Sequence, residues 1–135
     1  MKHPRMNDYD TKALIVIANQ SDDENTKGMI RRILVDRFNV VKYSTPYLLN
    51  RFTISEGIMK EVYADMVIMA MCMDKISVPV EMEDDLIQYA SIDVLVSYGT
   101  AVESLEFRKK CRDEFWERSL ARDKSYKEMM QKKYR

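Results

Sequence analysis

The feature that most constrains the fold is a set of apolar runs separated by charged segments. Residues 66–73 read MVIMAMCM, and further runs occupy 13–18 (ALIVIA) and 92–98 (IDVLVSY). Continuous apolar runs of this length are typical of strands buried on both faces of a sheet. We therefore predict strands at 13–18, 40–43, 66–73 and 92–98.

Helical signals lie between these runs. Ser21-Asp22-Asp23-Glu24 and Thr53-Ile54-Ser55-Glu56 match the S/T-x-x-E capping box that opens a helix, and Pro79 precedes a third helical segment. Strands that alternate with helices predict an α/β fold, with a parallel sheet covered by helices on both faces. The expected architecture is a three-layer, doubly wound parallel sheet of four or five strands, Rossmann-like or flavodoxin-like, in the order 2-1-3-4.

The chain from Ser104 onward reads as one long helix. A stripe of large apolar residues, expected to pack on the sheet, comprises Phe107, Cys111, Phe115, Trp116 and Leu120. We predict a flexible N-terminal arm at 1–12, one α/β domain at 13–120 and a projecting helix or tail at 121–135. Two interpretations of the last segment stay open: a frayed end, or a helix that pairs with a second copy or another protein.

Composition excludes several classes of protein. There is no run of about 18 apolar residues, so no membrane span is expected, and the N-terminus lacks an apolar signal region. Cys72 and Cys111 show no CxxC spacing and read as reduced thiols, which indicates a cytoplasmic protein. The sole histidine, His3, supplies no ligand set, so neither a metal nor a cofactor is predicted.

The net charge of zero is unevenly distributed. Residues 1–102 hold 11 basic and 15 acidic residues, whereas 103–135 hold 11 basic and 7 acidic residues. This mixture gives no compact basic patch, so a nucleic-acid partner is not expected. The sequence also lacks the glycine-rich motifs of dinucleotide-binding and P-loop proteins.

The predicted topology places a ligand site at one edge of the sheet. Doubly wound sheets bind ligands beyond the carboxyl ends of their strands. In this chain those ends carry polar residues, so four of them are the candidate substrate-binding residues: Asn19, Asp74, Ser77 and Tyr98.

Two segments carry a family resemblance. Residues 64–68 (ADMVI) and 77–83 (SVPVEME) resemble the nucleoside 2-deoxyribosyltransferase superfamily, which includes deoxynucleoside monophosphate N-glycosidases. That family has an AD pair entering a buried strand and S-x-G-x-G-x-E opening a helix. The resemblance implies that Glu83 is the nucleophile that attacks the sugar C1′ and that Ser77 contacts a 5′-phosphate.

The sequence departs from the family pattern at several positions. Pro79 and Glu81 replace the two motif glycines, and Gly57 occupies the position of the second catalytic carboxylate. Glu56 is adjacent to Gly57 and is therefore the second catalytic candidate. The ordinary interpretation of Glu83 is a first-turn carboxylate favoured by the helix dipole.

A second resemblance is to response-regulator receiver domains. Residues 14–16 (LIV) and 65–69 (DMVIM) are similar to receiver strands, but the phosphoacceptor position falls on Ala70. The leading functional hypothesis is a nucleotide or nucleoside pocket that cleaves or transfers an N-glycosidic bond through Glu83. The alternative is a non-catalytic relative that binds a nucleotide or a protein partner, or a degenerate receiver-like domain.

Overall fold

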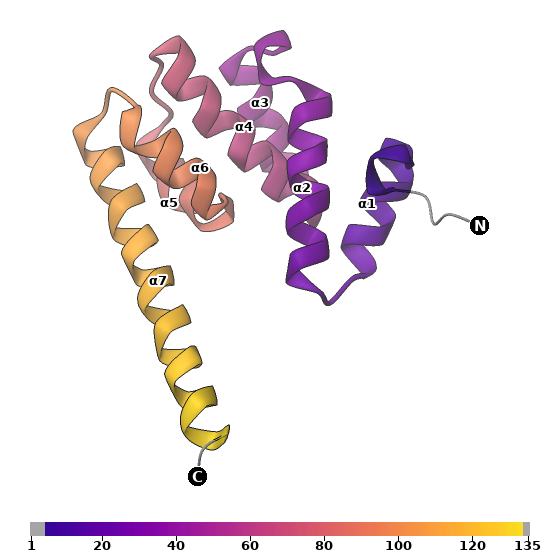
Figure 1. Cartoon of the computed structure of the whole chain (residues 1–135). Helices are drawn as coiled ribbons and strands as arrows, with labels where there is room; N and C mark the ends of the chain where they lie inside the picture. Colours follow the sequence, from indigo (N-terminus) through magenta and orange to yellow (C-terminus); the bar gives the residue numbers. More distant parts are fainter. Residues whose placement is uncertain (1–4, 134–135) are drawn as a thin grey trace.

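The computed structural model describes the backbone of residues 5–133 and their side chains, except those of Tyr126, Met130 and Lys133. Within this range every regular element is helical (Figure 1). The α-helices are α1 (Thr11–Gln20), α2 (Glu24–Phe38), α3 (Thr45–Ile54), α4 (Ile58–Asp74), α5 (Val80–Tyr89), α6 (Ile92–Ser97) and α7 (Leu105–Lys133). Three short 3₁₀ helices are η1 (Met6–Asp8), η2 (Val40–Lys42) and η3 (Gly99–Ala101). No described helix combines the length and apolar character needed to cross a bilayer.

The predicted α/β fold is wrong, because residues 5–133 contain no strand. The runs at 13–18, 66–73 and 92–98 lie in α1, α4 and α6, and most of 40–43 forms η2. A continuous apolar run suits a helix covered on all sides as well as a buried strand. Alanine and methionine, both good helix formers, are abundant in 66–73. The Rossmann-like and flavodoxin-like descriptions fail with the sheet, as does the fold implied by both family resemblances.

Helix α4 is the centre of the molecule. It packs against α1, α2, α3, α5 and α6, with α1–α3 and α5–α7 to either side of it in Figure 1. The consecutive residues Met66, Val67 and Ile68 are all 0% exposed. Since consecutive helical residues point about 100° apart, burial surrounds the helix at this level. This explains why the segment shows no polar face.

A buried ion pair ties α4 to its neighbours. Arg31 of α2 donates to both carboxylate oxygens of Asp65, at 2.7 and 2.9 Å, and the Ser91 backbone N–H donates to Asp65 at 2.8 Å. Arg31 also donates to the Tyr89 carbonyl. Burial raises the pKa of Asp65, and the Arg31 guanidinium opposes that rise. One carboxylate therefore joins α2, α4 and the α5–α6 junction.

The predicted helices at 24–38, after Pro79 and after Ser104 are confirmed as α2, α5 and α7. Asp23, rather than Ser21, caps α2 by accepting from the Asn25 N–H at 3.1 Å. The helix start predicted from the capping signature at 53–56 is wrong, because α3 ends within that segment at Ile54 and α4 begins at Ile58. In the predicted N-terminal arm, residues 1–4 lie outside the described residues, and η1 and the start of α1 occupy most of the remainder.

Helix α7 runs without interruption past the body of the molecule (Figure 1). Its first turns pack against α5, α6 and η3, and Phe107 and Cys111 are fully buried there. The contact with η3 is close: a Cβ at Gly99 would lie 2.5 Å from Cys111 Sγ. From residue 120 onward α7 extends away from the other helices, and its described side chains are exposed.

Candidate functional site

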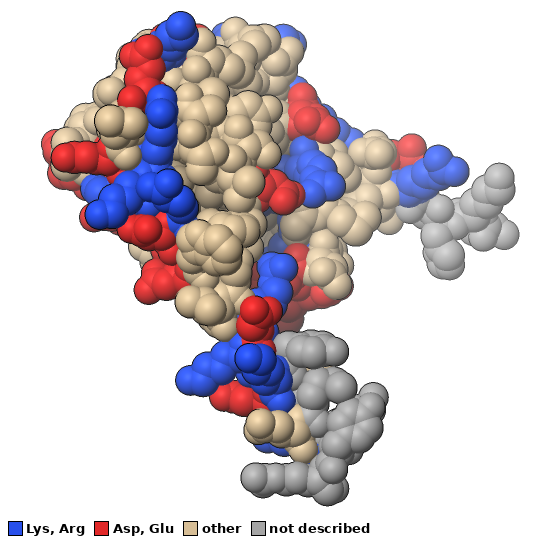
Figure 2. Space-filling model, turned by 60° about the vertical axis from the view of Figure 1, so that its left-hand side comes forward, with Lys and Arg blue, Asp and Glu red and all other residues tan. Residues whose placement is uncertain are grey.

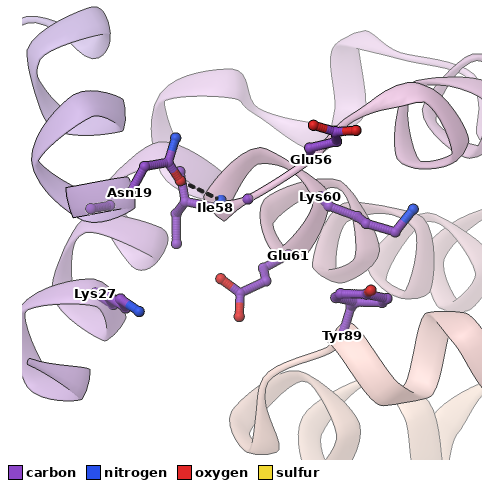
Figure 3. A pocket seen from close by; sticks show the side chains of 9 residues that line it. Asn19, Lys27, Glu56, Ile58, Lys60, Glu61 and Tyr89 are labelled. Carbon is purple, nitrogen blue, oxygen red and sulfur yellow. Dashed lines mark hydrogen bonds between the residues drawn. The ribbon is translucent and has the colours of Figure 1, made fainter. Parts of the chain in front are cut away.

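Two of the predicted site residues, Asn19 and Glu56, line the same hollow (Figure 3). It lies where the end of α1, the start of α4, helix α2 and the end of α5 meet, and its volume is about 380 Å³. The lining residues are Ala18, Asn19, Lys27, Glu56, Gly57, Ile58, Lys60, Glu61 and Tyr89. We call this cavity the α1–α4 hollow.

Asn19 holds the start of α4 in place. Its side-chain Oδ1 accepts from the Ile58 N–H at 2.8 Å, which satisfies a backbone donor that the helix itself leaves unpaired. Gly57 precedes it with φ 63°, a conformation that favours glycine. A Cβ at Gly57 would lie 2.5 Å from Asn19 Oδ1. The position that the family resemblance assigned to a carboxylate is therefore a structural glycine.

The charges in the α1–α4 hollow are mixed. Burial raises the pKa of Glu61, against the attraction of Arg31 at 3.6 Å. The Lys60 amine donates to the Phe52 carbonyl at 3.1 Å and lies 5.3 Å from the centre of the Tyr89 ring. Figure 3 shows Glu61 pointing into the open middle of the hollow. Lys27, Lys60 and Tyr89 were not predicted, because they come together only through packing of helices that the predicted sheet did not contain.

The other four predicted residues do not line this hollow. Glu83 of α5 is 5% exposed and accepts from the Lys110 amine at 3.1 Å. Asp74 ends α4 and accepts weakly from the Thr45 hydroxyl at 3.5 Å, while Ser77 is an exposed residue of the α4–α5 loop. Tyr98 follows α6 and is half-buried. The structure therefore does not place Glu83 and Ser77 beside Asn19 and Glu56.

The first half of α7 has apolar residues on two opposite sides. Phe107 and Cys111 face the body, whereas Leu105, Trp116 and Leu120 are 73%, 58% and 65% exposed. At about 100° per residue these three residues fall within about 60° of one another, roughly opposite the buried pair. The prediction that Trp116 and Leu120 pack on the body is wrong. We call Leu105, Trp116 and Leu120 the outward face of α7.

An acidic groove of about 390 Å³ lies beside the outward face, between α5 and α7. It is lined by Asp84, Ile87, Gln88, Lys110, Asp113, Glu114 and Glu117. Lys110 pairs with Asp84 at 3.4 Å, and Arg118 pairs with Glu114 at 2.8 Å. Asp113 and Glu117 form no ion pair with any described side chain and are exposed.

Arg118 fixes the wall of this groove. Its guanidinium donates to the carbonyls of Ile87, Gln88 and Ala90 at 2.8, 3.1 and 2.6 Å. These carbonyls belong to the last turn of α5, which has few intrahelical partners for them. The contact docks α7 against α5 and leaves the next turns of α7 to extend beyond the body.

Within the described residues, no group of three or more His, Cys, Asp and Glu side chains is arranged to hold a metal ion. Comparison of the chain with models of known protein families, with curated proteins and with solved structures found no match.

Proposed function

We propose that this protein is a helical protein-binding module and that the outward face of α7 is its binding surface. The observation that carries the proposal is the exposure of Trp116 and Leu120, one helical turn apart, on the side of α7 opposite its packed side. A helix that meets only water on that side gains nothing from large apolar residues there. Neighbouring Trp and Leu side chains on one helix face are typical anchors of helix-mediated recognition.

Two further observations support this surface. Helix α7 continues beyond the body, so a partner can lie along it without displacing another element (Figure 1). Figure 2, in which the left-hand side of Figure 1 comes forward, shows a broad uncharged area with charged side chains along its margins. Depletion of charged residues at the centre, with charges at the margin, is common in protein interfaces.

Site-directed photocrosslinking tests the proposal. A photoreactive amino acid replaces Leu120 in the full chain, and the same substitution at Val16, an exposed residue of α1, is the control. We expect a crosslinked polypeptide from the Leu120 position and none from Val16. If Leu120 captures no polypeptide of any kind in cells that express the protein, the outward face is not a binding surface.

A second candidate function is binding of a nucleoside or nucleotide in the α1–α4 hollow. It is favoured by one observation: Asn19 and Glu56, predicted separately, lie there together with Lys27 and the Tyr89 ring. An amide, a carboxylate and an aromatic ring suit a base, and a lysine suits a phosphate. Melting temperatures measured with deoxynucleosides and their monophosphates test this. A bound compound should raise the melting temperature, and Glu56→Gln should make that rise smaller. If no compound raises the melting temperature, the nucleotide-binding function is contradicted.

A further inference from the structure

The outward face of α7 lies next to charges of both signs, in separate places along the helix. Asp113 and Glu117, which border the acidic groove, lie before Leu120 in the chain. Lys124 and Lys127 lie after it and are exposed. Figure 2 shows side chains of both signs where α7 leaves the body, with Asp and Glu among the Lys and Arg. At about 100° per residue, these four charged residues fall within about 80° of one another. These four residues therefore lie along one edge of the outward face, with the acidic pair toward the body and the basic pair away from it.

We infer that the partner of the outward face is a second copy of this chain, with the two α7 helices antiparallel and crossing near Leu120. This inference rests on the proposed function, since it names the occupant of the same surface. The observation that supports the antiparallel pair is the spacing of the charged residues along α7. Asp113 and Lys127 lie at equal distances before and after Leu120, and Glu117 and Lys124 lie at nearly equal distances. In an antiparallel pair, residues at equal distances from the crossing point face each other.

Twofold symmetry repeats the pairing of opposite charges at both ends of the interface. It brings the charged edge of one copy against the same edge of the other, so each acidic pair meets a basic pair. Trp116 and Leu120 of both copies then lie at the centre, out of water. A parallel pair would instead place the two charged edges on opposite sides of the interface, so the acidic pair would not meet the basic pair. The bodies lie on the far sides of the two helices, because the outward face is opposite Phe107 and Cys111.

A charge-swap experiment tests this arrangement. One variant carries D113K and E117K, and the other carries K124E and K127E; all four side chains are exposed, so both variants should fold. Circular dichroism of each variant checks this. By sedimentation, the wild-type chain should have twice its 16.0 kDa monomer mass at high concentration. Each variant alone should be a monomer, because its two facing edges have the same charge.

The mixture of the two variants is the decisive sample. Each facing pair in a mixed dimer has opposite charges again, so equal amounts should restore the doubled mass. A wild-type chain that stays monomeric at every concentration, variants that remain dimers, or a mixture that stays monomeric would each overturn the inference. If Leu120 then crosslinks to a different polypeptide, the proposed binding surface stands and only the identity of its occupant is wrong.

Discussion

Helices α4 and α7 both carry large apolar residues on more than one side, but only α4 has neighbours on every side. In α4 the apolar residues form the core, and burial of each stabilises the fold by roughly 1.5–3 kcal/mol. In α7 one apolar side packs on α5, α6 and η3, and the opposite side faces solvent. Apolar residues around a helix therefore indicate that it is surrounded; where the chain itself does not surround it, we infer a partner.

The largest expected loss of stability follows removal of the Asp65 carboxylate. Asp65→Ala removes the closer of the two ion pairs that the part-buried Arg31 guanidinium forms with described side chains, and it leaves the Ser91 N–H without an acceptor. Breaking a buried pair in this way costs about 3–5 kcal/mol, measured by urea denaturation. The matched control is Asp93→Ala, which removes the exposed pair with Arg32 and should cost less than about 1 kcal/mol. Equal losses would contradict the central position of α4.

A direct comparison of α4 with α7 comes from one truncation in each helix. Ile68 is fully buried, so Ile68→Ala should lower the free energy of unfolding by about 2–5 kcal/mol. Leu120→Ala should change it by less than about 0.5 kcal/mol in dilute solution, because no described neighbour covers Leu120. Urea denaturation of both variants measures the difference. A large loss for Leu120→Ala at low concentration would mean that the outward face packs within the monomer.

Two glycine substitutions should change the stability of the protein in opposite directions. Gly57→Ala places a Cβ against Asn19 Oδ1 and keeps a positive φ, so a loss of roughly 1–3 kcal/mol is expected. Gly28 lies inside α2 with open space around its Cα, so Gly28→Ala should stabilise by about 0.4–1 kcal/mol. Melting temperatures of the two variants give both signs. Destabilisation of the chain by Gly28→Ala would contradict the helical assignment of 24–38.

A further expected effect is a pH dependence of stability from Cys111. Burial, aided by the Glu83 charge, raises the pKa of this thiol from 9.0 to about 12. Between these values the unfolded chain loses a proton that the native chain keeps, so stability falls as the pH rises above 9. From about pH 8 to about pH 10, the wild-type chain should lose about 1 kcal/mol more than Cys111→Ala. Equal losses would mean that Cys111 is accessible to water.

The sequence predicts part of this fold for identifiable reasons. Helices α2 and α5 follow polar or proline start signals, and α7 is long and rich in charge, so local patterns were sufficient. The runs in α1, α4 and α6 have no period that separates a buried strand from a buried helix. Length was the better guide, because α4 extends over residues 58–74, well beyond a typical strand.

Prediction of the site depended on the same choice between a buried strand and a buried helix. Asn19 was predicted at the end of a strand and Glu56 near the start of a helix. Both line the α1–α4 hollow, but through the packing of helices and not at the edge of a sheet. Trp116 and Leu120 were assigned to the core because they extend a stripe that begins at Phe107. A count of about 100° per residue separates them from that stripe. The signal for the outward face was therefore present in the sequence.

Hydrogen exchange at low and high protein concentration tests the contrast between α4 and α7 most directly. We predict that amides of 58–74 exchange slowly at both concentrations, because α4 is enclosed within one chain. Amides of 113–128 should exchange quickly when dilute and more slowly when concentrated, as α7 gains a partner. Rapid exchange in 58–74, or exchange in 113–128 that does not depend on concentration, would contradict the account.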